Sequence, residues 1–440
     1  MFQTLRNAWK IEDLRKKMLF TIFIILIFRI GSAVTVPFVD GTALATAMGG
    51  ASSYLMMMSG GGFSTGSIFA LSITPYINAS IIIQLLTVAI PALERLSKEG
   101  EAGRKRLAQI TRYTTVILGL ILAVAYYLLA RNRNALVSYA YSGFDAWFAA
   151  IVIIFCFTAG SALMMWLGEQ INEKGIGNGI SILLFAGILS SLPTAADYLW
   201  GIFYDYGIAM VADDQAGAIG NILIAVLILV LFLLMVAFIV FMGDAERRIP
   251  VQYAKKVVGR KMYGGQNTYI PIKVNMSGVM PIILAVSILG LPSIIYGFLS
   301  NKPTEGFWGW FFSAFTEDSW LYIILYFLMI IGFAFFYVTI QYNPTEMANN
   351  LRKNGGAVPG QRPGKPTADF IKRVLNKVTF IGALFLGVIA LFPSLFGKIT
   401  GVTGLTIGGT SLMIVVGVAL ETVQQIESQM MMRHYKGFLD

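Results

Sequence analysis

The chain has 440 residues, of which 56% are hydrophobic and 13% charged, with a mean hydropathy of +0.71. This balance excludes an ordinary soluble domain and indicates a polytopic membrane protein. The chain has one histidine, His434, and one cysteine, Cys156, so a histidine-based triad, a metal site rich in His or Cys and an internal disulfide are excluded by count. We expect no catalytic residues, no metal and no cofactor.

Apolar runs of nearly 20 residues recur along the chain, and each is long enough to cross the hydrocarbon core of a bilayer. The pattern predicts an all-α fold with ten transmembrane spans, numbered here in chain order: Met18–Pro37, Ala70–Ile90, Thr114–Ala130, Ala146–Leu167, Gly179–Ala196, Gly220–Met242, Val274–Leu299, Trp320–Tyr342, Val378–Phe396 and Gly409–Val423.

The basic residues predict the orientation of the spans. Most of the 33 lysines and arginines fall in the segments that share a side with the N-terminus, and most of the +10 net charge reflects this asymmetry. Because cytoplasmic segments carry the excess of Lys and Arg, both termini are predicted to be cytoplasmic, which implies a multi-pass protein of the cytoplasmic (inner) membrane.

Two features at the start of the chain each have two interpretations. Met1–Lys17 mixes Phe2 and Trp9 with charged residues, so it is either a helix lying in the membrane interface or only a basic flank that sets orientation. Arg29 lies well inside span one. It is either a functional or pairing residue, or a side chain that reaches toward the outer surface.

The stretch Ser59–Leu86 differs from an ordinary span. Gly60, Gly61, Gly62 and Gly66 disfavour a helix, whereas Pro75 suits a first helical turn. We therefore expect a loop or weakly held half-helix followed by a real helix. Irregular backbone at membrane depth is tolerated where protein buries it or where it lines a watery cavity, so the stretch predicts a cavity or pore.

Span seven opens in a similar way, with small and polar residues followed by Pro281 in NMSGVMPIILAVSIL. One broken segment in each set of five spans is typical of an inverted-repeat fold. The predicted halves are residues 1–196 and 197–440.

Two long hydrophilic loops, residues 243–274 and 343–375, connect spans six to seven and eight to nine. The first alternates apolar and basic residues around a Gly-Gly pair and predicts a projecting β-hairpin; the second is punctuated by Gly and Pro. Their exposed basic residues favour docking of an acidic partner, either RNA or protein, over simple orientation and connection.

Several strings together resemble the SecY family, the channel subunits of the bacterial Sec protein translocase. They are SIFALSITPYINASIIIQLLT, MWLGEQINEKGIGNGISILLFAGI, KVNMSGVMPIILA, the RPG of VPGQRPGKPTAD, and GGTSLMIVVGVALET. The resemblance extends from span one to span ten. It implies two pseudo-symmetric five-helix halves hinged at spans five and six, with a lateral gate between spans two and three on one side and seven and eight on the other.

The resemblance also implies roles for particular residues. A ring of apolar side chains constricts the pore of the family, and by motif position it falls on Ile73, Ile77, Ile180, Leu184, Ile283 and Ile414. The implied plug is residues 52–66, with Met57, Gly60, Gly61, Gly62 and Phe63. Asn78 falls at a lateral-gate position. The implied docking residues for a SecA motor ATPase and the ribosome are Arg247, Arg248, Lys255, Lys256, Arg352, Lys353, Arg362 and Lys365.

These features predict a channel, not an enzyme, that translocates unfolded preproteins and releases apolar segments into membrane lipid. Implied partners are small SecE-like and SecG-like membrane subunits, the SecA motor, the ribosome and preproteins bearing signal peptides. The alternative is an ion-coupled secondary transporter. Such proteins usually keep Asp, Glu or His within their spans, whereas here only Glu421 lies near the inner end of the last one.

Overall fold

The computed structural model describes residues 2–47, 59–141, 143–190, 215–253, 256–258, 261–263, 267–298, 306–316, 319–400 and 409–436, together with positions 193, 197, 200 and 201. The first half of the chain is helical. Its elements are α1 (Phe2–Lys10), α2 (Glu12–Ala33), α3 (Gly41–Ala47), α5 (Gly62–Thr65), α6 (Thr74–Ala89), α7 (Pro91–Lys98), α8 (Glu101–Asn132), η1 (Ser138–Tyr141), α9 (Gly143–Lys174) and α10 (Gly179–Leu189).

The second half adds helices and a small amount of sheet. The helices are α12 (Gln215–Asp244), α13 (Met280–Phe298), α14 (Gly306–Ala314), α15 (Trp320–Gln341), α16 (Pro344–Lys353), α17 (Lys365–Thr400) and α18 (Gly409–Lys436). The strands are β1 (Glu246–Tyr253), β2 (Lys256–Val258), β3 (Lys261–Tyr263), β4 (Asn267–Lys273) and β5 (Gly356–Ala357).

Each of the ten predicted spans overlaps one helix, and these helices are α2, α6, α8, α9, α10, α12, α13, α15, α17 and α18. By length and composition alone, five helices of the described part could cross a membrane, or six if α6 and α7, bent by 102° at Ile90, form one broken span. Helix α10 has 11 residues and is too short to cross by itself.

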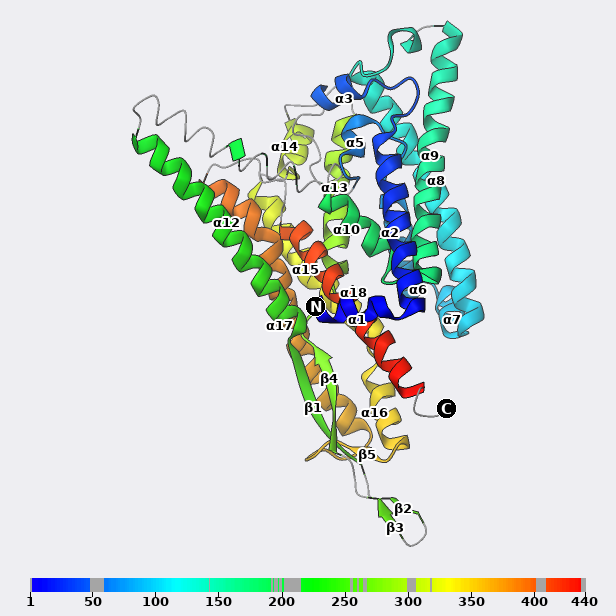
Figure 1. The fold of residues 1–440 in the computed structure, drawn as a ribbon, viewed down its shortest axis with the longest axis vertical. Helices are drawn as coiled ribbons and strands as arrows, with labels where there is room; N and C mark the ends of the chain where they lie inside the picture. The colour runs from blue at the N-terminus through cyan, green and yellow to red at the C-terminus, as the bar shows by residue number, and fades with distance from the viewer. Residues whose placement is uncertain are drawn as a thin grey trace.

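Most helices of the two halves lie on opposite sides of the molecule (Figure 1): α2, α6, α8 and α9 on one side, and α12, α15 and α17 on the other. The strands extend from one end of the helices, here called the sheet end, while α3 and α14 lie toward the other, here called the far end. Within each half, glycines allow close backbone packing. A Cβ at Gly160 of α9, for example, would lie 2.0 Å from the carbonyl oxygen of Ile68.

The predicted β-hairpin is confirmed by the antiparallel pairing of β1 with β4, with Arg247 opposite Ile272 and Val251 opposite Thr268. The second loop adds β5 to the other edge of β1, which gives the strand order β4-β1-β5. Inward residues of the sheet, including Ile249 and Ile272, pack with residues of α15, α16 and α17 in one apolar cluster. The two loops therefore form a single folded unit at the sheet end.

The charged segment between spans two and three is helical. It forms α7 and the first turns of α8. Ion pairs one helical turn apart support both helices in water, with Lys98 Nζ 2.6 Å from Glu94 Oε1 and Lys105 Nζ 3.3 Å from Glu101 Oε1.

Candidate functional site

One apolar cluster joins the two halves of the chain. Its buried members come from α2, α6, α9 and α10 of the first half and from α13 and α18 of the second half. Five of the six predicted ring residues are buried in it, with exposed fractions between 1% for Ile73 and 6% for Ile77, and Ile180 packs against it half-buried. The structure thus brings all six side chains together, although their separation in sequence reaches from residue 73 to residue 414.

Local structure explains how these side chains converge. Ile73 precedes the first turn of α6, and Pro75 occupies that turn as predicted, so Ile73 and Ile77 lie one turn apart. Asn178 caps α10, because its side-chain oxygen accepts a hydrogen bond of 3.1 Å from the Ile180 amide. Ile180 and Leu184 then share a face of α10.

Ile283 and Ile414 occupy the early turns of α13 and α18. The starts of these two helices therefore bring the second half of the chain to the same cluster as α6 and α10.

The described part of the predicted plug is Ser59–Gly66, while Met57 lies outside the described residues. Phe63 of this part is buried in a second apolar cluster, together with residues of α8 and α9. This part is held more firmly than its glycine content predicted. Ser59 is fully buried, its hydroxyl accepts a hydrogen bond of 2.8 Å from the Phe63 amide, and Phe63 is 8% exposed. Glycines at positions 60, 61 and 66 have positive φ angles, and this allows the tight turns on both sides of α5.

Arg29 approaches the same segment. Its Nη1 donates a hydrogen bond of 3.4 Å to the carbonyl oxygen of Gly60. Of the two interpretations of Arg29, this contact favours the pairing role. The segment also lies against the end of α10, since a Cβ at Gly60 would lie 3.5 Å from the carbonyl oxygen of Gly187 and 2.6 Å from Oγ of Ser190, the residue after the helix.

On the side where the lateral gate is predicted, the contact between the halves includes a polar pair as well as apolar side chains. Asn78 is half-buried on α6, one residue beyond Ile77. Two turns further along the helix, Gln84 Oε1 accepts a hydrogen bond of 2.7 Å from the Tyr337 hydroxyl of α15. Helix α8 also contacts α13. Sequence reasoning missed the pair, because Tyr337 is one of several aromatic residues in an apolar span.

The contacts of α18 define the other side of the interface between the halves. Helix α18 packs on α10, α12 and α17, and it also contacts α1. Ala8 of α1 is fully buried in a small cluster with Leu14, Ile176 and Ile426. The N-terminal segment is therefore a helix that packs on the last span, and its position in the membrane interface stays a prediction.

The predicted docking residues lie around the sheet end. Those with described side chains are all exposed: Arg247, Arg248, Arg352, Lys353, Arg362 and Lys365. Lys256 lies on β2, and Lys255 falls outside the described residues. Arg248 is already engaged, because its Nε lies 2.6 Å from Glu246 Oε1 and its guanidinium lies 4.8 Å from the centre of the Tyr269 ring. The hydrogen bond to Glu246 raises the pKa of Arg248.

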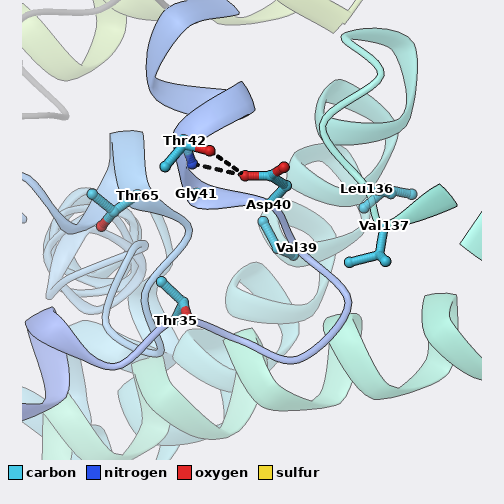
Figure 2. A pocket seen from close by; sticks show the side chains of 8 residues that line it. All are labelled: Thr35, Val39, Asp40, Gly41, Thr42, Thr65, Leu136 and Val137. Carbon is cyan, nitrogen blue, oxygen red and sulfur yellow. Dashed lines mark hydrogen bonds between the residues drawn. The ribbon is translucent and has the colours of Figure 1, made fainter.

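A surface pocket of about 660 Å³ lies where α3 begins (Figure 2), toward the far end of the molecule. Asp40, the one carboxylate among the described residues that line it, accepts hydrogen bonds from the amide and hydroxyl of Thr42 at 3.0 and 2.6 Å, so it acts as the cap of α3. These bonds, the hydroxyl first, hold the pKa of Asp40 below its usual value. The pocket is lined by Thr35, Val39, Asp40, Gly41, Thr42, Thr65, Leu136 and Val137.

Comparison with known proteins agrees with this arrangement. The SecY family model matches residues 67–423. The protein translocase subunit SecY of Streptomyces galbus is 43% identical and that of Streptomyces coelicolor 44% identical, with all of each chain covered.

Two solved structures share the fold at lower identity. One is a SecY structure, with a TM-score of 0.65 and 18% identity over 94% of this chain and 92% of the other. Its plug domain is described as stabilising the closed state of the translocation channel and maintaining a membrane seal. Sec61 in the canine ribosome-channel complex has a TM-score of 0.60 and 17% identity, over the same shares.

Fold and site therefore define a multi-pass helical membrane protein with the architecture of a protein-conducting channel. The chain belongs to the SecY family. The relatives are translocase subunits, so they lend no support to the transporter alternative.

Proposed function

We propose that this protein is the channel through which unfolded preproteins cross the bacterial cytoplasmic membrane, and from which apolar segments leave sideways into lipid. The observation that carries the proposal is the convergence of six branched aliphatic side chains from both halves in one buried cluster. The names of the relatives, which are translocase subunits over the full length of the chain, agree with it.

The chemistry of the cluster suits a seal around a moving peptide. Aliphatic side chains offer a polypeptide no polar partner that would retain it, and a narrow apolar constriction blocks ions by excluding water. The cluster joins separate halves of the chain, so it can widen when the halves separate. We assign the pore ring to Ile73, Ile77, Ile180, Leu184, Ile283 and Ile414.

The asymmetric contact between the halves supports a hinge and a gate. Helix α18 of the second half packs on α10 and contacts α1 of the first half, which would keep the halves together on that side. On the other side, α8 meets α13, and one described side-chain hydrogen bond joins Gln84 of α6 to Tyr337 of α15. We assign the lateral gate to this second side, where Asn78 lies, and the plug to the segment that includes Gly60–Phe63.

The sheet end is the proposed docking surface for a SecA-like motor ATPase and for the ribosome. Exposed basic residues from both long loops gather on one folded unit there, which suits acidic protein or RNA phosphate. This assignment places the sheet end and both termini in the cytoplasm. SecE-like and SecG-like subunits are the proposed membrane partners, as in a translocase.

Reconstitution tests the proposal. Vesicles containing the chain with candidate small subunits, a motor ATPase, ATP and a signal-bearing preprotein should protect the preprotein from added protease. The same preprotein with a charged residue in the apolar core of its signal is the matched control and should stay accessible. The proposed function would be contradicted if both preproteins were protected equally. It would also be contradicted if neither preprotein were protected although the motor hydrolyses ATP.

A further inference from the structure

The segment proposed as the plug is fastened to the rest of the protein by a buried tyrosine. Tyr126 of α8 is 1% exposed, and its hydroxyl donates a hydrogen bond to the carbonyl oxygen of Phe63 in α5. The pairing of these residues does not follow from their spacing, because 63 positions separate them in the sequence.

Aromatic packing adds to this hydrogen bond. The rings of Phe63 and Tyr126 meet edge to face at 5.0 Å, and Tyr126 meets Phe157 of α9 at 4.6 Å. Phe157 is fully buried. Edge-to-face pairs at these distances stabilise an arrangement beyond the area they bury. Three rings from α5, α8 and α9 therefore form an edge-to-face cluster, which together with the hydrogen bond fixes both the side chain and the backbone of Phe63.

The other end of α5 is also fastened. The Val36 amide donates to the Gly66 carbonyl at 2.9 Å, and the Ile68 amide donates to the Val34 carbonyl at 2.9 Å. These backbone bonds tie the exit of the segment to the chain that follows α2. At its entrance the segment passes through Gly60 and Gly61, both with positive φ angles. Tyr126 thus holds α5 at Phe63, and α5 begins directly after the pair Gly60 and Gly61.

We propose that Tyr126 is a positioning residue that holds the plug segment in its resting place, so that its ring contact with Phe63 and its hydroxyl bond to the Phe63 carbonyl together set how often the resting channel opens. The inference rests on the proposed channel function and deepens it. The bond joins a buried donor to a backbone acceptor, and loss of the donor leaves that acceptor without this partner in an apolar surrounding. The displaced position of the segment then becomes more populated relative to the resting one.

The test compares Tyr126→Phe with Tyr127→Phe. Both changes remove one hydroxyl from a buried tyrosine of α8, since Tyr127 is 6% exposed. The readout is ion conductance of vesicles that contain the channel and no preprotein, normalised to inserted protein. We expect Tyr126→Phe to raise resting conductance about tenfold, the shift that ~1.4 kcal/mol produces, and Tyr127→Phe to change it less than twofold. Equal conductance of the two variants would overturn the proposal.

Further variants keep the test decisive. A merely structural role would lower the thermal stability of Tyr126→Phe and leave resting conductance at the level of Tyr127→Phe. If Tyr126→Phe does not insert, Phe63→Leu decides, because it removes the ring contact and keeps the side chain apolar; unchanged conductance then overturns the proposal. Two further measurements in the same kind of vesicles separate failure of this inference from failure of the channel function. They are preprotein translocation by the wild type and ion leakage of a variant of the pore ring, such as Ile77→Asn.

Discussion

The hydrogen bond between Gln84 and Tyr337 gives a direct test of the proposed gate. The Tyr337 hydroxyl is 2.7 Å from Gln84 Oε1, and the bond joins α6 of the first half to α15 of the second. Tyr337→Phe removes the donor and keeps the ring. If the bond exists only while the gate is closed, its loss shifts the equilibrium toward the open gate.

The expected size of the shift follows from the setting of the pair. Side-chain hydrogen bonds between membrane helices contribute about 0.6 kcal/mol on average and up to about 1.7 kcal/mol. At ~1.4 kcal/mol per factor of ten, the open fraction should rise roughly threefold, and at most about twentyfold. Gln84 is exposed, which favours the lower value.

The assay is translocation of a preprotein with a weakened signal, for which gate opening limits the rate. We expect Tyr337→Phe and Gln84→Leu each to raise this rate, and the double variant to raise it no further, because both single changes break the same bond. A preprotein with a strong signal serves as the control and should show little change. Additive effects of the two changes, or slower translocation by Tyr337→Phe, would refute the gate assignment.

Two further predictions concern packing and docking. Gly160→Ala places a Cβ 2.0 Å from the Ile68 carbonyl oxygen and should destabilise the protein by about 1–3 kcal/mol in an unfolding titration. Gly332→Ala on α15 is the control: a Cβ there would meet no described atom within 4 Å outside its own stretch of helix, so this change should be neutral or stabilising. Equal effects of the two changes would contradict the packing. Arg362→Glu should slow motor-driven translocation severalfold without loss of insertion. Arg131→Glu, at the other end of the molecule, is the control and should leave the translocation rate unchanged. Undiminished translocation by Arg362→Glu would show that Arg362 is not part of the docking surface.

Much of the fold could be predicted because membrane crossing imposes a strong pattern. Apolar length located the helices, and span eight was predicted to within one residue of α15, Trp320–Gln341. Pro75 correctly indicated the start of α6, and the alternation of apolar and basic residues indicated the β1–β4 hairpin. In each case the signal is local, since a few adjacent residues decide the structure. The predicted turn at the Gly-Gly pair was wrong, because β2 pairs with β3 and the chain reverses between these two strands.

The sequence predictions failed in charged segments, where apolar length gives no signal, and where an element depends on a partner distant in the sequence. Helix α17 begins at Lys365, well before span nine, because a helix can continue beyond the apolar region when polar residues cover it. Strand β5 has two residues and depends on its partner β1, so no local pattern shows it.

The candidate site shows the same limit. Isoleucines one turn apart usually only pack helices, so the spacing of Ile73 and Ile77 carried no functional signal without the family resemblance. Contacts between distant segments, such as Tyr126 with Phe63 and Gln84 with Tyr337, are visible only in the fold.

The central claim is that six aliphatic side chains seal a pore between the halves, and ion conductance of resting vesicles tests it most directly. Ile77→Asn with Ile180→Asn places amides in the cluster, whereas Ile117→Asn with Ile121→Asn places them on the exposed face of α8, where these side chains are 61% and 55% exposed. We predict that the first pair raises conductance well above wild type and that the second pair does not. Wild-type conductance of a correctly inserted Ile77 and Ile180 double variant would contradict the account.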